Sequence, residues 1–140
     1  VTFRYGEILL NYAEAMNEAF GPENASTLGK TALQAVNEVR VRAGIANFPV
    51  GMSKDNFRLK LRNERRVELA FEDHRFWDVR RWKIGDETKT INQMEILPGN
   101  TLTYNTKLLE VRTFEDRMNL YPIPQIEINK NPNLVQNPNW

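Results

Sequence analysis

The sequence predicts a mainly α-helical fold, in which two helical hairpins are followed by an irregular C-terminal segment. Apolar residues recur at the spacing of a buried helical stripe over residues 1–44 and again over 54–83. Residues 84–140 lack this rhythm, and proline and asparagine recur toward their end. The length of 140 residues is that of one domain, so we expect a single domain over 1–140.

Composition excludes several classes of protein. Hydrophobic residues make up 41% of the chain and its mean hydropathy is -0.58, so it is neither a disordered segment nor a membrane span. Cysteine is absent and His74 is the one histidine, which excludes disulfides, thiolate metal sites and thiol nucleophiles. The net charge of +1 provides no general field for nucleic acid. We therefore expect no metal, no cofactor and no nucleic-acid partner.

The first helical hairpin is predicted over residues 1–44. The first helix ends at Gly21-Pro22, and the second begins between Ser26 and Thr31 and ends at Gly44. The residues expected on the buried stripe of the first helix are Tyr5, Ile8, Leu9, Tyr12, Ala13, Met16, Ala19 and Phe20, and those on the second are Leu28, Ala32, Ala35, Val36, Val39 and Ala43.

A third helix is predicted from about Lys54 to Glu72 and a fourth over 75–83, with His74 as a junction residue. Carboxylates fall on the stripe of the third helix where burial is expected, and a buried charge must be paired. Arginines stand three residues from these carboxylates, within reach on the same helix face. The predicted structural ion-pair network between helices is Glu64, Arg65, Glu68, Glu72, Arg75, Asp78 and Arg81.

A catalytic alternative uses the same carboxylates. Glu64, Glu68 and Glu72 are spaced so that neighbouring carboxyl groups approach the roughly 5–10 Å separation of a glycosidase pair. A glycosidase places its two carboxylates on different elements across a cleft, and one of them has a raised pKa. We therefore favour ion pairing and expect no catalytic residues. A glycoside hydrolase fragment that uses Glu68 and Glu72 remains the weaker alternative.

Aromatic residues offer a further binding hypothesis. Residues 75–83 mix basic and aromatic side chains, as a nucleic-acid stacking surface does, but Asp78 lies among them. We expect Trp77 and Trp82 to pack in the core instead. Rings in the irregular segments are able to stack on a sugar when exposed, although packing beneath a loop is the commoner arrangement. These rings are Tyr104, Phe114, Tyr121 and Trp140.

The irregular segment contains three local signals. A β-hairpin is expected over 88–97 and 102–114, with a turn at residues 98–100. Pro124 is suited to the start of a short helix over 125–128. Successive turns follow at two Asn-Pro pairs, 131–132 and 137–138, and we expect Leu134 and Trp140 to hold them against a surface.

Four stretches of the chain resemble the SusD/RagB family, in the order in which that family has them. They are RYGEILLNYAEA at 4–15, AVNEVRVRAG at 35–44, ERRVELAFEDHRFWDVRRW at 64–82, and LYPIP at 120–124 followed by NPNLVQNP at 131–138. Gly6 stands where the family usually has Ala, and the turn at Asp73-His74 departs from the family pattern. Residues 88–117 are unmatched, as in a variable insertion.

The resemblance implies a tetratricopeptide-like helical scaffold and a non-enzymatic protein that binds an oligosaccharide or another nutrient. It implies a surface-exposed outer-membrane lipoprotein that partners a SusC-like TonB-dependent transporter. A chain that begins with Val in mid-pattern is expected to be the C-terminal portion of a longer protein, with its lipid anchor and its ligand-binding residues upstream. Arg65, Glu68, Arg75, Asp78 and Arg81 resemble scaffold residues of the last repeat. The alternative from a different class is a freestanding helical-repeat adaptor that binds protein.

Overall fold

A computed structural model describes residues 3–25, 27 and 29–140. Contacts divide the chain into two compact units, Val1–Arg75 and Phe76–Trp140. Helices dominate the described residues and a two-stranded sheet accompanies them, which confirms the mainly α-helical class. Each unit is described by itself.

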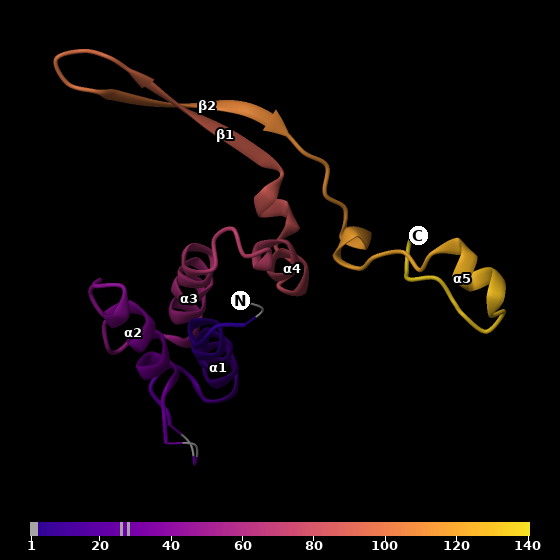
Figure 1. The fold of residues 1–140 in the computed structure, drawn as a ribbon, viewed down its shortest axis with the longest axis horizontal. Helices are drawn as coiled ribbons and strands as arrows, with labels where there is room; N and C mark the ends of the chain where they lie inside the picture. The colour runs from indigo at the N-terminus through magenta and orange to yellow at the C-terminus, as the bar shows by residue number, and fades with distance from the viewer. Residues whose placement is uncertain (1–2, 26, 28) are drawn as a thin grey trace. The chain divides into compact units, whose positions relative to one another are not determined.

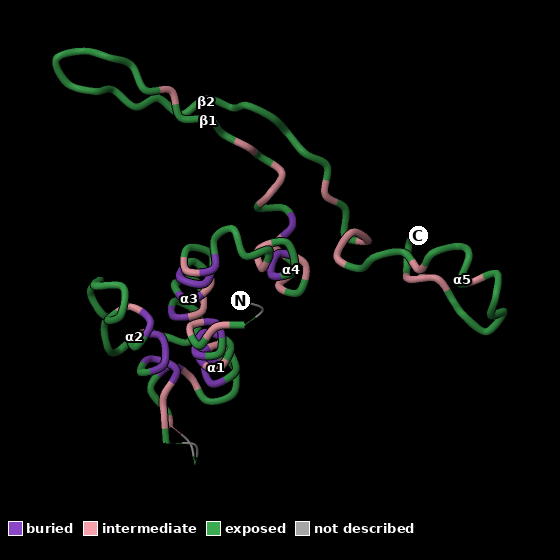
Figure 2. The backbone as a smooth tube through the Cα atoms, viewed as in Figure 1, coloured by how far each residue is buried: buried purple, intermediate pink, exposed green. Residues whose placement is uncertain are grey.

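The first unit is a three-helix assembly built around α1. Helix α1 spans Tyr5–Phe20 and packs against both α2, Ala32–Arg42, and α3, Lys54–Glu68 (Figure 1). Buried residues are concentrated on these three helices (Figure 2). The apolar core consists of Leu9, Leu10, Ala13, Met16, Ala32, Leu33, Ala35, Val36, Val39, Phe48, Phe57, Leu61 and Leu69.

Helix starts follow local capping chemistry. The Thr31 hydroxyl accepts from the Gln34 main-chain N–H at 3.0 Å, and the Gln34 side chain accepts from the Thr31 N–H at 2.8 Å. This capping box fixes the start of α2 at the later of the two predicted positions. Ser53 caps α3 in the same way by accepting from the Asn56 N–H. Ser26 and Leu28, which were predicted near the start of the second helix, lie outside the described residues.

The buried face of α1 differs from the predicted stripe, because α1 contacts two helices instead of one. Tyr12 is half-buried and donates its hydroxyl to the Lys30 carbonyl at 2.7 Å. Asn17 is fully buried and donates to the Lys54 carbonyl at 3.2 Å. The prediction was wrong for Tyr5, Ile8, Ala19, Phe20 and, on the second helix, Ala43, which are exposed, and it missed Glu7, Leu10 and Asn17, which are buried.

Helix α3 ends at Glu68, four residues before the predicted end. Phe71 and Asp73 have φ values of 65° and 62°, in the left-handed region that ends a right-handed helix. Phe71 is fully exposed as a result. The chain then enters α4, His74–Arg81, which begins one residue before the predicted helix and ends two residues earlier.

The second unit contains the rest of α4, the short 3-10 helices η2 (Gly85–Thr88) and η3 (Asp116–Asn119), a β-hairpin and α5 (Gln125–Lys130). The predicted hairpin is confirmed, with β1 at Thr90–Leu97 and β2 at Thr103–Val111. The register runs from Thr90 opposite Val111 to Leu97 opposite Thr103, with a bulge after Ile91. The predicted short helix is also confirmed and extends two residues further, to Lys130.

The hairpin has two chemically different faces. Met94 and Ile96 alternate along β1 on one face, and Tyr104 and Leu108 lie on the same face of β2; all four side chains are exposed. On the other face, the Lys107 ammonium lies 2.7 Å from the Glu95 carboxylate. A cross-strand ion pair of this kind supports the register.

Hydrogen bonds to the main chain hold the C-terminal turns. The Trp140 indole N–H donates to the carbonyls of Arg117 and Leu120, each at 3.0 Å. The Gln136 side chain bonds the N–H and the carbonyl of Ile123 at 2.7 and 2.9 Å. These bonds fold the last residues back onto the segment that follows η3, in agreement with the expected role of Trp140.

Gly85 makes a close contact that no larger residue permits. A Cβ atom at this position would lie 2.0 Å from the Phe114 ring. We expect Gly85→Ala to lower the free energy of unfolding by about 1–3 kcal/mol, because the ring must move out of a packed position. Urea denaturation followed by tryptophan fluorescence measures the change. The double variant Gly85→Ala/Phe114→Ala serves as the control: if the clash is the cause, the added cost of the alanine disappears when the ring is absent.

Candidate functional site

Arginines from the first two helices bind the carboxylates of α3. Arg4, the residue before α1, binds the Glu68 carboxylate, and Arg42, the last residue of α2, binds the same group. Arg40 binds Glu64. The Glu64 and Glu68 side chains are 11% and 12% exposed, so both carboxylates are largely removed from water. One carboxylate at the end of α3 therefore ties together the start of α1 and the end of α2.

Arg4 makes two further contacts at the end of α3. Its guanidinium donates to the main-chain carbonyl of Glu68, one of the carbonyls that a helix C-terminus leaves without a partner. Its Nε atom lies 2.8 Å from the Glu72 carboxylate. A positive charge here also interacts favourably with the negative end of the helix dipole.

The other predicted network residues lie as follows. Arg65 is buried and donates to the Asn11 side chain at 2.7 Å. Asp78 is buried on α4 and lies 3.0 Å from Arg81, three residues along the helix. Arg75 is half-buried on α4.

Arg4, Arg40 and Arg42 were not predicted as partners of the glutamates. The predicted pairs follow spacing along one helix, whereas Arg4 and Glu68 are 64 residues apart. The available signal was the position of these arginines at the two ends of the first helical hairpin, inside the stretches 4–15 and 35–44.

Ion pairing shifts the titration of two carboxylates. Hydrogen bonds from Arg4 lower the pKa of Glu72, and those from Arg58, 2.5 Å away, lower the pKa of Glu18. The same bonds raise the pKa values of Arg4 and Arg58, so both guanidinium groups stay charged. A general acid needs a raised carboxyl pKa, and the Glu72 shift is in the opposite direction.

His74 lies at the junction where it was expected, as the first residue of α4. Its Nε2 atom is 3.7 Å from the buried carboxylate of Glu7. Among the described residues, no group of three or more histidine, aspartate and glutamate side chains is arranged to hold a metal ion.

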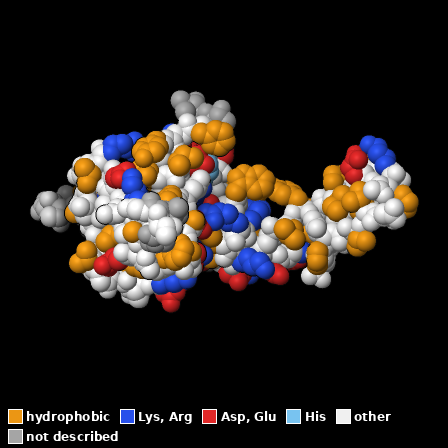
Figure 3. Space-filling model, turned by 90° about the horizontal axis from the view of Figure 1, so that it is seen from below, with side chains coloured by type: hydrophobic (Ala, Val, Ile, Leu, Met, Phe, Trp, Pro, Cys, Tyr) orange, Lys and Arg blue, Asp and Glu red, His pale blue; other side chains and the backbone are white. Residues whose placement is uncertain are grey.

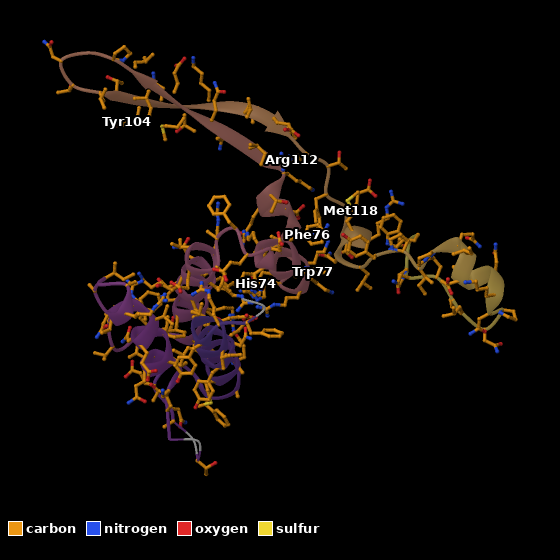
Figure 4. The ribbon with its side chains drawn as sticks, in the orientation of Figure 1. His74, Phe76, Trp77, Tyr104, Arg112 and Met118 are labelled. Carbon is orange, nitrogen blue, oxygen red and sulfur yellow. The ribbon has the colours of Figure 1, made fainter. Side chains whose placement is uncertain are left out.

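The second unit contains a pocket of about 690 Å³ between α4 and the segments that include η3 and the C-terminus. Figure 4 labels Phe76 and Trp77 on α4 and Met118 on η3 in this region. The lining residues include Trp77, Arg80, Lys83, Arg117, Leu120 and Tyr121.

The aromatic residues on and beside α4 are more exposed than predicted. Trp77 was expected in the core, but it is 57% exposed, and Trp82 is only half-buried. The eight-residue helix α4 carries aromatic residues on more than one face, so its periodicity does not identify a single buried stripe. Tyr121, considered as an exposed stacking ring, is 55% exposed and its ring lies 6.1 Å from that of Trp77.

Cationic groups lie beside these rings. The Arg80 guanidinium lies 3.5 Å from the Phe76 ring centroid, and that of Arg117 lies 4.7 Å from the Trp140 centroid. On the face shown in Figure 3, acidic and basic side chains are interspersed with hydrophobic ones.

We expect Glu68→Gln to lower the free energy of unfolding by about 2–4 kcal/mol, because Arg4 and Arg42 lose their compensating charge in a partly buried site. Thermal denaturation followed by circular dichroism measures the change. Glu127→Gln, which removes one carboxylate from an exposed pair with Lys130, is the matched control and should change stability by less than about 1 kcal/mol. An unchanged melting temperature for Glu68→Gln would show that the network is not structural.

Acidification should destabilise the chain through Glu18 and Glu72. Their folded-state pKa values are depressed, so the stability they contribute is present above the unfolded value of about 4.3 and is lost as the pH falls through the folded pKa. Urea denaturation at intervals between pH 6 and pH 3 measures this decline. In Arg58→Gln the decline should be shallower, because Glu18 loses the partner that lowers its pKa; parallel curves for the two proteins would contradict the assignment.

Comparisons with known proteins give a consistent result. The sequence profile of the SusD family matches residues 1–140. SusD-like proteins P2 and P25 of Formosa agariphila are each 32% identical to this chain, over 98% and 97% of its length. The alignments cover 25% and 23% of those relatives, so the chain spans about a quarter of their length.

Two solved structures share the fold. The crystal structure of a SusD-like protein from Bacteroides fragilis matches all of this chain with a TM-score of 0.80 and 37% identity, and the match covers 26% of that protein. A SusD homolog from Bacteroides thetaiotaomicron matches 99% of the chain with a TM-score of 0.68 and 29% identity. The resemblance seen in the four sequence stretches is confirmed: this chain belongs to the SusD family.

Proposed function

We propose that this chain is the C-terminal helical scaffold of a nutrient-binding component in a SusC/SusD-type outer-membrane uptake system. Membership of the SusD family and the coverage of about a quarter of its relatives support this reading. The whole protein binds an oligosaccharide or another nutrient and delivers it without chemical conversion. The first unit supplies the mechanical framework for that task.

The observation that carries the scaffold role is the double coordination of Glu68. Arg4 and Arg42 hold this carboxylate from two different helices, and Arg4 also binds the carbonyl that ends α3. We therefore assign the Glu68 carboxylate a structural role, because removing either arginine leaves a charge that is only 12% exposed with one partner fewer. The remaining members that we assign to the network are Glu64, Arg65, Glu72, Arg75, Asp78 and Arg81.

A binding role is favoured over glycoside hydrolysis. Glu68 and Glu72 share one guanidinium, that of Arg4, instead of facing each other across a cleft. The pKa of Glu72 is lowered, so this group is ionised at neutral pH and does not serve as a proton donor. These observations support a protein without a catalytic residue in this chain.

Membrane attachment is proposed to come from a lipid anchor upstream of this chain, at the cell surface. Among the residues that the structure describes, no helix has the length and apolar character needed to cross a bilayer. The partner is proposed to be a SusC-like TonB-dependent transporter. The rival assignment is a helical adaptor for another protein, which the exposed side chains of Val67 and Phe71 favour.

The test uses the whole protein that contains this chain, tagged and extracted from outer membranes. We expect it to co-purify with a TonB-dependent transporter, and we expect Glu68→Gln to reduce the recovered complex together with the folded protein, because the scaffold is weakened. Glu127→Gln should leave the recovery unchanged. Recovery from the cytosol with a different partner would establish the adaptor, and release of sugar from a polysaccharide that depends on Glu68 and Glu72 would establish the hydrolase.

A further inference from the structure

We propose that the pocket of the second unit binds a negatively charged sugar, that is, a pyranose that carries a carboxylate or a sulfate ester. The inference rests on the proposed nutrient-binding function and adds a site and a ligand class to it. Three features of the pocket carry the argument: its size, its exposed rings and its unneutralised cations.

The pocket has the size and lining of a ligand site. Its volume of about 690 Å³ lies within the range of small-molecule pockets, which are typically about 300–1,000 Å³. The walls come from α4, from the segment around η3 and from residues 138–139. Residues far apart in the sequence thus converge on one cavity within a single compact unit.

Two rings in the lining leave half of their surface uncovered. Trp77 and Tyr121 are both more than half exposed, and their planes are inclined by 53°. Phe76 contacts both rings, with its centroid 5.1 Å from that of Trp77 and 6.1 Å from that of Tyr121, and such aromatic contacts are favourable. The C–H face of a pyranose is apolar, so covering such a ring removes apolar surface from water on both partners.

Cations outnumber carboxylates in the lining. Arg80, Arg81, Lys83 and Arg117 contribute four positive charges and Asp116 one negative charge. Asp78 offsets Arg81, and Glu115 lies 2.7 Å from Arg117. Among the described residues, no carboxylate lies within ion-pair distance of Arg80 or Lys83. The pocket therefore retains positive charge after its internal pairs are counted.

Arg80 also has unused hydrogen-bonding capacity. Its Nη1 atom donates to the Phe76 carbonyl at 3.0 Å, and its guanidinium packs on the Phe76 ring, so the side chain is held in position. A guanidinium has five N–H donors, and the structure shows one of its nitrogens, Nη1, engaged with the Phe76 carbonyl. A guanidinium held in this way is suited to a carboxylate or a sulfate, which offers several acceptor oxygens.

A charged sugar fits this arrangement better than a nucleic acid. A single-stranded nucleic acid needs a basic groove that follows its phosphates and aromatic rings on which successive bases stack. Acidic and basic side chains are interspersed on the face in Figure 3, and the Trp77 and Tyr121 rings are inclined to each other instead of parallel. Arg80 and Lys83 line one cavity, which matches a ligand with a local negative charge.

Isothermal titration calorimetry on the whole protein tests the proposal with four probes: an oligogalacturonate, a sulfated galactan oligosaccharide, a neutral malto-oligosaccharide of equal length, and a single-stranded DNA. We expect at least one acidic sugar to bind at least tenfold more tightly than the neutral sugar and the DNA, and to bind more weakly as the salt concentration rises. The two acidic probes distinguish a carboxylate ligand from a sulfate ester.

Paired variants locate the binding. Lys83→Gln and Trp77→Ala should each weaken binding of the acidic sugar at least tenfold. The controls Lys130→Gln and Tyr104→Ala remove an exposed charge and an exposed ring from elsewhere in the same unit, and should leave the affinity unchanged. Melting temperatures of all four variants exclude unfolding as the cause of a loss.

Three outcomes would overturn the site. They are equal or tighter binding of the neutral sugar, equal or tighter binding of the DNA, and acidic-sugar binding that survives both Lys83→Gln and Trp77→Ala in folded protein. In each of these cases, continued co-purification with a TonB-dependent transporter would leave the proposed function standing. Loss of both sugar binding and transporter association would reject the two proposals together.

Discussion

The carboxylate of Glu68 is the constraint on which the first unit depends. It stands where α3 ends and is held by a residue before α1 and by the last residue of α2. The apolar core draws on residues from all three helices, so it forms only when the helices pack together. The same packing removes the Glu68 carboxylate from most of its contact with water. Its two guanidinium partners therefore make the burial of the core compatible with the charges on α3.

The two units are stabilised by different interactions. The first unit buries an apolar cluster from all three of its helices. In the second unit, Asp78, Val79 and Gly85 are the buried residues among those described, and the hairpin has exposed apolar side chains on one face. Its shape depends instead on specific bonds, such as those of the Trp140 indole and the Gln136 amide. Such a unit leaves a large share of its apolar surface available for contact with a ligand or a protein.

Local sequence patterns predicted the features that depend on interactions between residues close together in the chain. Capping at Thr31, the turn between the two strands and the helix after Pro124 depend on near neighbours, and each lies close to its predicted position. The partners of Glu68 were missed because pairing by three-residue spacing covers only a single helix. The exposure of Trp77 was missed for a similar reason: burial depends on which neighbours cover a ring, and an eight-residue helix gives too few turns to show it.

Arginines lie in both units, but the balance of positive and negative charge around them differs between the two. In the first unit, each of Glu64, Glu68 and Glu72 has at least one guanidinium partner, so the arginines there are committed to the fold. In the second unit, Asp78 offsets Arg81, yet Arg80 and Lys83 line the same pocket without a carboxylate partner among the described residues. Positive charge that the fold does not neutralise raises the energy of an empty site and lowers that of a site holding an anion. The excess of cations, more than the presence of arginine and tryptophan, is what distinguishes a binding site from a structural network in this chain.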